Sequence, residues 1–521
     1  MVQGAEQLKG QTSDRLETVI LDVAKTESIT AATKWVKEHA RDRGVWGLVN
    51  KADISMPTAP NEWLTKQNFM KILDVNLLGV IEVTLSLLSL VRKARGRDVN
   101  ISSVEPGVSL WWELLHVQGR ALYFGVKIIM IKPGQDRYVH PPVSTLARLE
   151  FHPSLPVSVP CKAMWLYLAV LVGLYYLLRW YRERQVVSLL QDKFVFITGC
   201  DSGFGNLLAR QLDLRGLRVL ATCLTEQGAE QLNGQTSDRL ETVILDVTKT
   251  ESIAAAAEWV KERVGDRGLW GLVNNAGICT PMAPNEWLTK QDFVKMLDVN
   301  LLGMIEVTLS LLPLVRKARG RVVNVSSVMG RVSLFGGGYC MSKYGVEAFS
   351  DSLRRELSYF GVKVAMIEPG YFMTNMTSPE VFNGSLQASW DQASPEIKEL
   401  YGEKFVADFM KTSNLLKPSW SGNLSLMTNC MEHALTSCHP RTRYSAGWDA
   451  KFFYLPVSYM PTFLVDLMMY WGAPRPAKAL KELSYFGVKE EMIVPGYFKT
   501  FVTSPEAISR GLQAAWDQAS S

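Results

Sequence analysis

Short apolar runs alternate with longer amphipathic stretches between residues 193 and 367. The apolar runs are continuous, which is typical of strands that are buried on both faces of a parallel sheet. The runs that predict strands are Lys193–Ile197, Arg218–Ala221, Thr242–Leu245, Leu269–Val273, Val322–Val325 and Val362–Ile367, with helical stretches such as Leu207–Leu214 between them. This pattern predicts an α/β fold, a doubly wound parallel sheet of the Rossmann type.

An uncharged apolar run precedes these strands. It extends from Met164 to Leu178, and Arg179, Arg182 and Arg184 follow it. About 15 residues is short against the roughly 20 that cross a bilayer, so a buried core helix is the alternative. Because its Tyr and Trp side chains and the arginines are typical of a membrane interface, we expect a membrane-anchor helix over residues 164–184. Lys162 is the only charge near its other end, which leaves the orientation open.

Long internal repeats divide the chain. Residues 3–103 repeat residues 227–327 at a constant offset, residues 123–134 repeat the segment that begins at Tyr359, and residues 483–520 repeat residues 357–394. These copies are too long and too incomplete for a solenoid of short stacked units. We expect an incomplete degenerate copy (1–134), a Pro-rich linker (135–163), the anchor (164–184), a complete unit (185–476) and a partial repeat (477–521).

Composition adds limits rather than new features. The 521 residues include 56 basic and 51 acidic side chains, a net charge of +5 without long basic runs, so we expect no nucleic-acid partner. The seven cysteines form no CxxC motif and no Cys/His pair at metal-ligand spacing. Buried free thiols are therefore favoured, and no metal site is expected.

A glycine-rich turn follows the first predicted strand. It reads Thr198-Gly199-Cys200-Asp201-Ser202-Gly203-Phe204-Gly205 and opens a helix. Glycines allow the backbone to turn tightly and to approach a pyrophosphate, whose charge is favoured at a helix N-terminus. Such a turn alone is a weak indication, and its place after the first strand of a parallel sheet strengthens the prediction of a dinucleotide site.

This turn and further motifs resemble the short-chain dehydrogenase/reductase family. The matching residues are Asn274-Asn275-Ala276-Gly277 for its NNAG motif, Asn300 for its helix asparagine, Ser327 for its active-site serine, Tyr339 and Lys343 for its YxxxK pair, and Pro369, Gly370 and Thr374 for the segment over the nicotinamide. The resemblance implies that Asn300, Ser327, Tyr339 and Lys343 are catalytic and that Ser327 also binds substrate. It implies a cofactor site made of Thr198, Gly199, Ser202, Gly203, Phe204, Gly205, Asn275, Ala276, Gly277, Tyr339, Lys343, Pro369, Gly370 and Thr374, with Asp246 beside the adenine.

Tyr123, Tyr359 and Tyr485 also stand four residues before a lysine. They lie at the entry to a predicted strand, whereas Tyr339 follows Ser327 by twelve residues and opens a predicted helix over Ser342–Leu357. Residues four apart share one face of a helix. For any single pair, a core tyrosine beside a solvated lysine is the simpler interpretation, but the register with the other motifs favours Tyr339 as the acid/base.

Oxidation of an alcohol removes the hydroxyl proton while hydride leaves the carbinol carbon. Tyrosine has a pKa near 10, so a neighbouring ammonium must favour its phenolate at pH 7. The resemblance assigns this role to Lys343, which would also bind the nicotinamide ribose, while Asn300 would link Lys343 to solvent. Residues Ala221–Glu226 offer no Arg or Lys to a 2′-phosphate, and an acid at the end of the second strand is missing; we expect NAD rather than NADP.

The segment Arg441–Lys451, with His433 and His439, resembles the C-terminal region of the microsomal retinol dehydrogenase and 17-beta-hydroxysteroid dehydrogenase type 6 group. The resemblance covers Met164 to about Leu480. It implies a membrane-bound oxidoreductase of the endoplasmic reticulum that transfers hydride from all-trans-retinol or a 3-alpha- or 17-beta-hydroxysteroid to NAD, with a homodimer as a candidate assembly. We expect the histidines to be structural, and Phe452–Trp471 to dip into the bilayer, line a lipid-sized pocket or pack in the core.

The first copy lacks most of this chemistry. It begins after the first strand and glycine turn, and a deletion before Tyr123 removes the counterparts of Tyr339 and Lys343. Asp98 replaces Val322 in what should be a buried strand, where an unpaired charge is costly. We expect residues 1–163 and 477–521 to be non-catalytic. The alternative function is a catalytically impaired pseudoenzyme or binding protein, because of these flanking copies.

Overall fold

The computed structural model describes residues 17–54, 59–101, 127–131, 161–334, 336–416, 420–470 and 473–479. Most of the expected linker and of the C-terminal partial repeat lies outside these ranges, as do Ser103, Tyr123 and Tyr485. Side chains of residues 161–169, at the start of the expected anchor, are also outside the description.

The complete unit is built on a seven-stranded parallel sheet in the order β10-β9-β8-β7-β4-β5-β6. Its strands are β4 (Phe194–Ile197), β5 (Arg218–Cys223), β6 (Leu240–Ile244), β7 (Gly271–Asn274), β8 (Arg321–Val325), β9 (Lys363–Pro369) and β10 (Arg443–Ala446). β4, β7 and β8 are buried at every position, as continuous apolar runs require. The predicted doubly wound parallel sheet is confirmed, and β10 is an additional edge strand.

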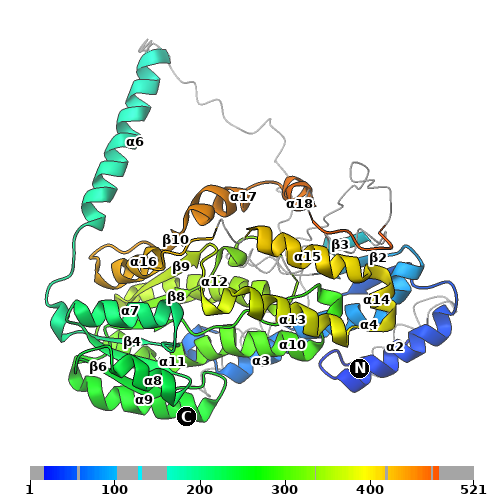
Figure 1. The fold of residues 1–521 in the computed structure, drawn as a ribbon, viewed down its shortest axis with the longest axis horizontal. Coiled ribbons are helices and arrows are strands. Elements are labelled where there is room, and N and C mark those ends of the chain that lie inside the picture. The colour runs from blue at the N-terminus through cyan, green and yellow to red at the C-terminus, as the bar shows by residue number, and fades with distance from the viewer. Residues whose placement is uncertain are drawn as a thin grey trace, which may run out of the picture.

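Helices cover both faces of this sheet (Figure 1). They are α7 (Gly203–Leu214), α8 (Glu226–Asn233), α9 (Thr250–Val264), α10 (Lys290–Leu297), α11 (Met304–Lys317), α12 (Gly338–Leu357), α13 (Pro379–Gln392), α14 (Pro395–Tyr401), α15 (Glu403–Leu416), α16 (Ser425–Thr436), α17 (Leu455–Val457) and α18 (Thr462–Tyr470). Short helical turns are η6 (Leu190–Asp192), η7 (Gly265–Arg267), η8 (Asn285–Trp287), η9 (Asp298–Gly303), η10 (Val328–Gly330), η11 (Ser358–Phe360), η12 (Asn375–Thr377) and η14 (Ala450–Tyr454). α7 and α16 pack on one face, and α9, α11 and α12 on the other, which gives two separate apolar cores.

Local sequence accounts for where several helices begin. Ser378 and Ser394 cap α13 and α14, and each is followed by a proline in the first turn, where the missing N–H costs nothing. Thr289 and Asp292 form a reciprocal capping box at the start of α10. These signals are local, so the helices begin where the sequence indicates.

The strand order reverses between β4 and β7. The chain moves outward from β4 to β5 and β6 in one direction, and from β7 to β10 in the other. The loops after β4 and β7 therefore diverge at the carboxyl edge of the sheet, which is where doubly wound sheets bind their ligands. This topology brings the glycine turn and the Asn275–Gly277 segment together.

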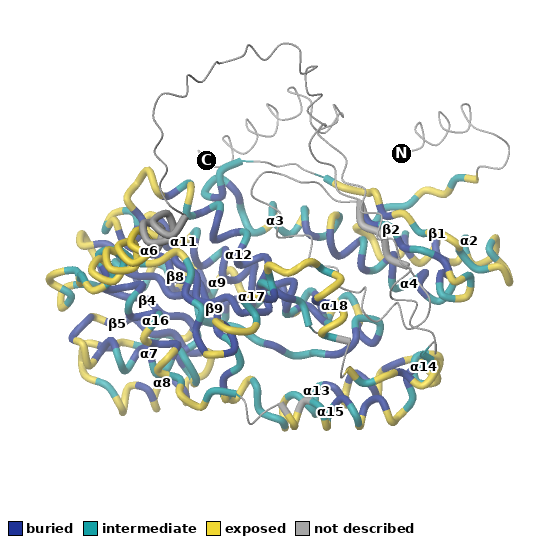
Figure 2. The backbone as a smooth tube through the Cα atoms, turned by 90° about the horizontal axis from the view of Figure 1, so that it is seen from above, coloured by how far each residue is buried: buried dark blue, intermediate teal, exposed yellow. Residues whose placement is uncertain are grey.

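The first copy forms a separate three-stranded parallel sheet, β1 (Gly47–Asn50), β2 (Arg97–Ile101) and β3 (Lys127–Ile131). Its helices are α2 (Thr26–Ala40), α3 (Lys66–Leu73) and α4 (Val80–Lys93), with turns η1 (Asn61–Trp63) and η2 (Asp74–Gly79). β1, β2 and β3 correspond to β7, β8 and β9, so the described part of this copy lacks the half that would close a crevice. It lies at the end of the molecule opposite β4, β5 and β6 (Figures 1 and 2).

Asp98 is 1% exposed in β2, as expected. Its carboxylate has no ion pair among the described residues, but the side-chain amides of Asn50 and Asn100 donate hydrogen bonds to it at 3.3 and 3.2 Å. Burial still raises the pKa of Asp98 to about 6, although the bond from Asn100 opposes the shift. The two amides offset part of the free-energy cost of burying the carboxylate, but a net cost remains.

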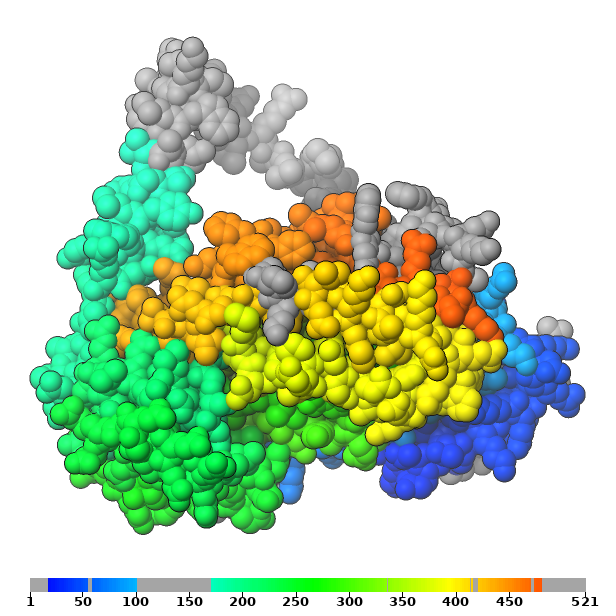
Figure 3. Space-filling model, viewed as in Figure 1, coloured from blue at the N-terminus to red at the C-terminus, as the bar shows by residue number. Residues whose placement is uncertain are grey.

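The expected anchor forms α6 (Cys161–Glu183), a helix of 23 residues. At 1.5 Å per residue it is roughly 35 Å long, enough to span a bilayer core. The large apolar side chains described on it are about half exposed or more; they are Val170, Leu171, Val172, Leu174, Tyr175, Tyr176, Leu177, Leu178, Trp180 and Tyr181. The helix stands clear of the body (Figure 3). This exposed apolar surface is typical of a helix that faces lipid, and the anchor role of α6 stays a prediction.

Where side chains are described, which excludes residues 161–169 of α6, two helical stretches are long and apolar enough to cross a membrane, Lys66–Lys93 and Lys290–Lys317. Their most apolar windows are 50% and 61% buried inside the protein. Both stretches contain core helices of the two sheets, and their burial accounts for their hydropathy.

Replacing Asp98 with valine, the residue of the complete unit, should stabilise the first copy. Between about pH 4 and pH 6 the folded copy keeps a proton on Asp98 that the unfolded chain has lost. The Asp98 carboxylate therefore destabilises the folded copy as pH rises through this range, and the effect is fully present above pH 6. A shift of roughly two units corresponds to about 3 kcal/mol. Amide hydrogen exchange of β1 and β2 should slow in Asp98→Val, more at pH 8 than at pH 4 once intrinsic rates are corrected.

The converse substitution Val322→Asp is the matched control, and it should speed exchange in β7 and β8. Equal protection of β1 and β2 in Asp98→Val and the wild type at pH 8 would contradict the assigned cost.

Candidate active site

The glycine turn after β4 requires glycine for conformation and for space. Gly199 and Gly203 have φ values of +70° and +64°, in the left-handed region that favours glycine. A Cβ at Gly199 would lie 2.9 Å from the Ala276 Cα, and one at Gly205 would collide with the Gly199 carbonyl oxygen. The backbone on both sides of the crevice is therefore in direct contact.

Thr198 ties the two sides of the crevice together. Its buried hydroxyl accepts hydrogen bonds from the backbone N–H groups of Asn275 and Ala276, each at 3.0 Å. In return the Asn275 side-chain amide donates to the carbonyls of Thr198 and Gly199 at 3.0 and 2.9 Å. The glycine turn and the segment after β7 consequently form one rigid edge.

The remaining residues of the turn point in different directions. Ser202 is exposed at the N-cap of α7, without a side-chain bond to that helix. The Phe204 ring packs edge-on against Phe372, 5.4 Å between centroids. Gly203 has nothing within 4 Å of a virtual Cβ. Open glycine backbone at the start of α7 is the arrangement that a pyrophosphate needs, so these residues fit a dinucleotide.

Tyr339, Lys343 and Ser327 meet at the carboxyl edge of the sheet. Ser327 lies just beyond β8, where its hydroxyl accepts from the Met329 N–H at 3.1 Å, and it also hydrogen-bonds the Tyr339 hydroxyl. The Lys343 ammonium lies 5.6 Å from the centre of the Tyr339 ring and donates to the Val325 carbonyl at 3.0 Å. α12 begins at Gly338, earlier than predicted, so Tyr339 and Lys343 both lie in it, one turn apart.

Desolvation dominates the acid–base properties of these groups. Burial raises the pKa of Tyr339 well above its usual value, and the bond from Ser327 opposes this. Burial lowers the pKa of Lys343 to about 8, while Cys279 and Glu347 act in the opposite direction. Lys343 is thus protonated below about pH 8 and becomes neutral above it.

Asn300 lies in η9, a π-helical turn between α10 and α11. Its carbonyl oxygen accepts from the Ile278 N–H, and its amide donates to the Ile278 carbonyl, both at 2.8 Å. The amide also donates to the Ser342 hydroxyl at 3.0 Å. Asn300 therefore joins the segment after β7 to α12. Asn76, its counterpart in the first copy, clamps Ile54 in the same way at 2.8 and 2.7 Å, so the clamp forms without the rest of the site.

The segment after β9 crosses the same edge. Gly370 donates its N–H to the Ala446 carbonyl at 2.8 Å, directly after Pro369, and a Cβ there would collide with the Asp449 carboxylate. Thr374 caps η12 through Thr377. The Cys279 thiol donates to the Met376 carbonyl at 3.2 Å and connects this segment to the one after β7. Cys279 carries no motif, so sequence reasoning missed it.

Asp246 and Asp201 stand at the outer side of the crevice. Asp246 accepts from the Thr248 hydroxyl and N–H at 2.7 and 3.0 Å, which shapes the turn into α9. Asp201 accepts from the N–H groups of Leu224 and Thr225 at 2.8 and 3.0 Å, directly beyond β5. An acid at the end of the second strand was judged missing from the sequence. The glycine turn after the neighbouring strand β4 supplies one, Asp201.

A buried charge network lies behind the candidate site. Arg443 of β10 contacts Glu347 of α12 at 3.1 Å and Asp351 at 2.8 Å, and Arg331 contacts Glu368 at 2.8 Å. Glu347 is fully buried one turn after Lys343, and burial with the nearby Glu368 raises its pKa. The network holds α12 against β9 and β10. Sequence reasoning missed it because its members are scattered along the chain.

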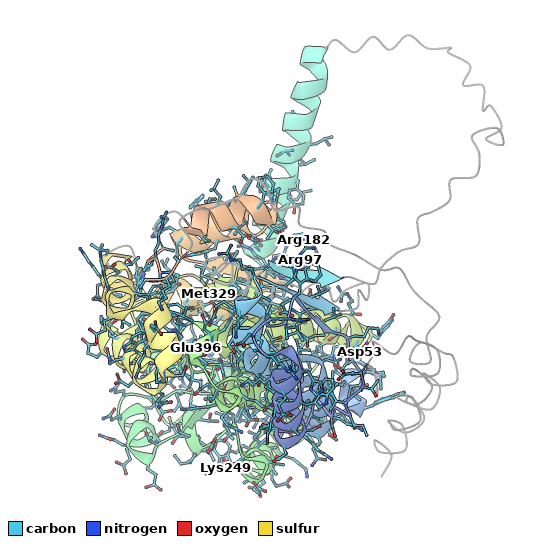
Figure 4. The ribbon with its side chains drawn as sticks, turned by 90° about the vertical axis from the view of Figure 1, so that its right-hand side faces the viewer. Asp53, Arg97, Arg182, Lys249, Met329 and Glu396 are labelled. Carbon is cyan, nitrogen blue, oxygen red and sulfur yellow. The ribbon has the colours of Figure 1, made fainter. Side chains whose placement is uncertain are left out.

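The two histidines lie where α6 meets the body. His433 bonds the Tyr444 hydroxyl and the Glu183 carbonyl, each at 2.8 Å. Arg182 reaches His439 at 3.3 Å, and Figure 4 shows Arg182 at the base of α6. These contacts agree with the expected structural role.

Among the described residues, no group of three or more His, Cys, Asp or Glu side chains is arranged to hold a metal ion. Six cysteines in the same ranges are free thiols, and four of them are buried.

A model of the short chain dehydrogenase family matches residues 1–111 and 193–382. The chain is 79% identical over 317 residues to retinol dehydrogenase 16 of Homo sapiens and 74% identical over 317 residues to retinol dehydrogenase 7 of Rattus norvegicus. It is 68% identical over 320 residues to 17-beta-hydroxysteroid dehydrogenase type 6 of Homo sapiens. Each match covers 61% of this chain and 100% of the relative. The resemblance noted in the sequence is confirmed.

Thr198→Val should weaken cofactor binding while preserving side-chain shape. The substitution leaves the N–H groups of Asn275 and Ala276 without their acceptor, and each orphaned buried group costs about 1–3 kcal/mol. We expect the KM for the nicotinamide cofactor to rise at least about tenfold and the Tm to fall. Thr198→Ser keeps the acceptor and should remain close to wild type. An unchanged cofactor KM in Thr198→Val would contradict the importance of this tie.

Proposed function

Because the chain belongs to the short-chain dehydrogenase family, we propose that its complete unit transfers a hydride from a membrane-borne hydrophobic alcohol to NAD, with Tyr339 as the acid/base. The observation that carries the proposal is the meeting of Tyr339, Ser327 and Lys343 beside the crevice between β4 and β7. The substrate is a retinol or a 3-alpha- or 17-beta-hydroxysteroid, in keeping with the names of the relatives.

Each side chain has a definite task in this proposal. When bound, the oxidised nicotinamide supplies the hydride acceptor. Ser327 holds the substrate oxygen, and the Tyr339 oxygen takes the hydroxyl proton. Desolvation opposes the phenolate, so the Lys343 ammonium has to offset it. The ammonium lies 5.6 Å from the centre of the Tyr339 ring, and a positive charge near a phenolate lowers the pKa of the tyrosine.

The surroundings of Tyr339 suit an apolar substrate. Tyr339 packs in one apolar cluster with Leu334, Tyr371 and Tyr454. Leu334 also belongs to a second cluster that contains Val457 of α17 and Val465 of α18. Apolar side chains thus continue from the candidate site to the helices that carry the exposed aromatic residues.

The membrane lies, in this proposal, against α6, α17 and α18. Phe452, Tyr459 and Phe463 are 77%, 75% and 61% exposed beside these helices. α6 projects from the side of the body along which α17 and α18 run (Figures 1 and 3). Among the alternatives for Phe452–Trp471, this arrangement favours contact with the bilayer. We assign the protein to the endoplasmic reticulum membrane as part of the same proposal.

The division of the chain into a degenerate copy, linker, anchor, complete unit and partial repeat belongs to the proposal as well. Catalysis is confined to residues 185–476, because the described part of the first copy lacks the strands that form the crevice. The contacts of Asn300, Ser327, Tyr339 and Lys343 in the complete unit argue against the pseudoenzyme alternative.

A nicotinamide cofactor follows from the family, and we propose that it is NAD. The Asp201 carboxylate beyond β5 supports this choice, because a negative charge there favours ribose hydroxyls and repels a 2′-phosphate.

The function is tested by expressing the full chain in microsomes and assaying retinol, a 17-beta-hydroxysteroid and a 3-alpha-hydroxysteroid with NAD. Tyr339→Phe removes the proton acceptor and should lower kcat by about 10²–10⁴. Tyr359→Phe is the matched control. Tyr359 also stands four residues before a lysine but is 90% exposed, so this variant should retain full activity. Undiminished turnover in Tyr339→Phe would refute the mechanism.

The pH profile of the same assay should report Lys343. Its pKa of about 8 means that the ammonium is lost as pH rises past 8, so kcat/KM for oxidation should fall above that pH. Lys343→Arg keeps its charge to beyond pH 12 and should lack this falling limb, at lower overall activity.

Asp201→Asn should relax the cofactor preference. Removal of the charge should raise the ratio of kcat/KM for NADP over NAD at least about tenfold. Asp201→Glu keeps the charge and should retain the preference for NAD. An unchanged ratio in Asp201→Asn would remove Asp201 from cofactor selection.

A further inference from the structure

The first copy and the complete unit are joined by ion pairs that come in reciprocal sets. Lys66 contacts Glu306 at 3.1 Å, and Lys290 contacts Glu82 at 2.9 Å. The repeat offset is constant, since Gln3 corresponds to Gln227. Lys66 therefore corresponds to Lys290, and Glu82 to Glu306. The two ion pairs are therefore the same contact made twice, once in each direction between the copies.

A second set obeys the same rule. Arg92 pairs with Glu286, and Arg316 pairs with Glu62. At the repeat offset Glu62 corresponds to Glu286, and Arg92 to Arg316. All four contacts are thus related by exchange of the two copies, which is the property of an isologous two-fold interface.

Apolar residues fill the space between these ion pairs. Leu73, Leu77, Leu78 and Ile81 of the first copy are 1–6% exposed and belong to the same core cluster as the α10, η9 and α11 residues of the complete unit. Their counterparts at the repeat offset, Leu297, Leu301, Leu302 and Ile305, are buried in that cluster too. The two helical stretches with high hydropathy, Lys66–Lys93 and Lys290–Lys317, are the two sides of this interface.

Two aspartates beside the interface have pKa values that a lysine of the opposite copy lowers. Burial raises the pKa of Asp298, and Lys66 of the first copy opposes the shift. Burial raises the pKa of Asp74, and Lys290 of the complete unit opposes it. Asp74 is the counterpart of Asp298 at the repeat offset.

The face of the complete unit is complementary to itself. The first copy carries Lys66 and Glu82 where the complete unit carries Lys290 and Glu306. Lys290 of one complete unit could therefore pair with Glu306 of a second complete unit, and the reverse. Two complete units could therefore pair through this face. In the full chain the face is covered by residues of the same molecule.

We propose that the first copy is a built-in substitute for a second subunit. Its residues 61–92 occupy, within one chain, the α10–η9–α11 face through which two complete units would otherwise pair. The full chain accordingly carries one complete unit per particle, and the homodimer considered from the sequence does not form. A covalently tethered copy has a high effective concentration at this face, so it outcompetes a second chain.

One contact extends this role to the helix that bears Tyr339. The Asn61 side-chain amide donates to the Ser352 hydroxyl at 2.8 Å and to the Glu356 carboxylate at 3.0 Å, both on α12. Phe69 packs edge-on against Phe349 of the same helix, 6.2 Å between centroids. The first copy therefore supports α12 from the side away from the buried charge network.

Zero-length carbodiimide cross-linking of lysine to glutamate tests the proposal on the full chain in detergent or membranes. Peptide mass spectrometry of the monomer band should find Lys66 joined to Glu306 and Lys290 joined to Glu82. A dimer band in which Lys290 of one molecule is joined to Glu306 of another would overturn the proposal. So would a monomer without either expected linkage.

Charge reversal provides the matched control. Lys66→Glu with Glu82→Lys places like charges opposite Glu306 and Lys290 while leaving the complete unit unchanged. This variant should dimerise, with a dissociation constant at least about tenfold tighter in sedimentation, and it should show the Lys290–Glu306 linkage between molecules. Adding Lys290→Glu and Glu306→Lys restores opposite charges within the chain and should restore the monomer.

A misfolded first copy would not be rescued by the second pair of reversals, so rescue separates pairing from folding. A double variant that stays monomeric in sedimentation would overturn the proposal. The cross-links do not depend on turnover: an inactive chain that carries them fails only the proposed function, and an active chain that lacks them fails only this inference.

Discussion

The Thr198 hydroxyl joins the two halves of the sheet at the point where the strand order reverses. It accepts two backbone N–H groups from the segment after β7, and the Asn275 amide returns two bonds to the glycine turn. Without these bonds the loops that diverge at the crevice would leave buried donors and acceptors unpaired. The close approach explains why glycine is needed at positions 199 and 205, and it places the start of α7 against the residues that follow β7.

α12 is the second element on which the site depends, and it is held from two sides. Behind it, Arg443 binds two carboxylates of the helix, and one of them follows Lys343 by one turn. At its other side, Asn61 of the first copy bonds two further residues of the same helix. Buried charges of this kind are costly to leave unpaired, so they fix the position of the helix more firmly than apolar contacts alone. The first copy is thus packed against the helix that bears Tyr339 and Lys343.

Several expectations from the sequence agree with the structure because they rest on local or periodic signals. Continuous apolar runs predicted six of the seven strands of the large sheet. Motif spacing selected Tyr339 from the tyrosines that precede lysine by four residues, and its catalytic role stays a prediction. β10 was missed because Arg443-Tyr444-Ser445-Ala446 alternates in burial and is too short for a clear pattern. The start of α12 was placed too late, because Gly338 and Tyr339 carry no helix-start signal. Asp98 was correctly expected to be buried, but its contact with Asn50 of the neighbouring strand β1 could not be identified from the sequence.

The sequence by itself determined the doubly wound fold, the repeat boundaries and the order of the motifs, since each of these follows from periodicity or from matching residues along the chain. Only the tertiary structure decided which distant side chains meet. Asp201 stands beyond β5 although it belongs to the turn after β4, and Lys66 binds Glu306 across 240 positions of sequence. The physical reason is that such contacts depend on how strands and helices stack in space, and a one-dimensional pattern carries no record of that packing.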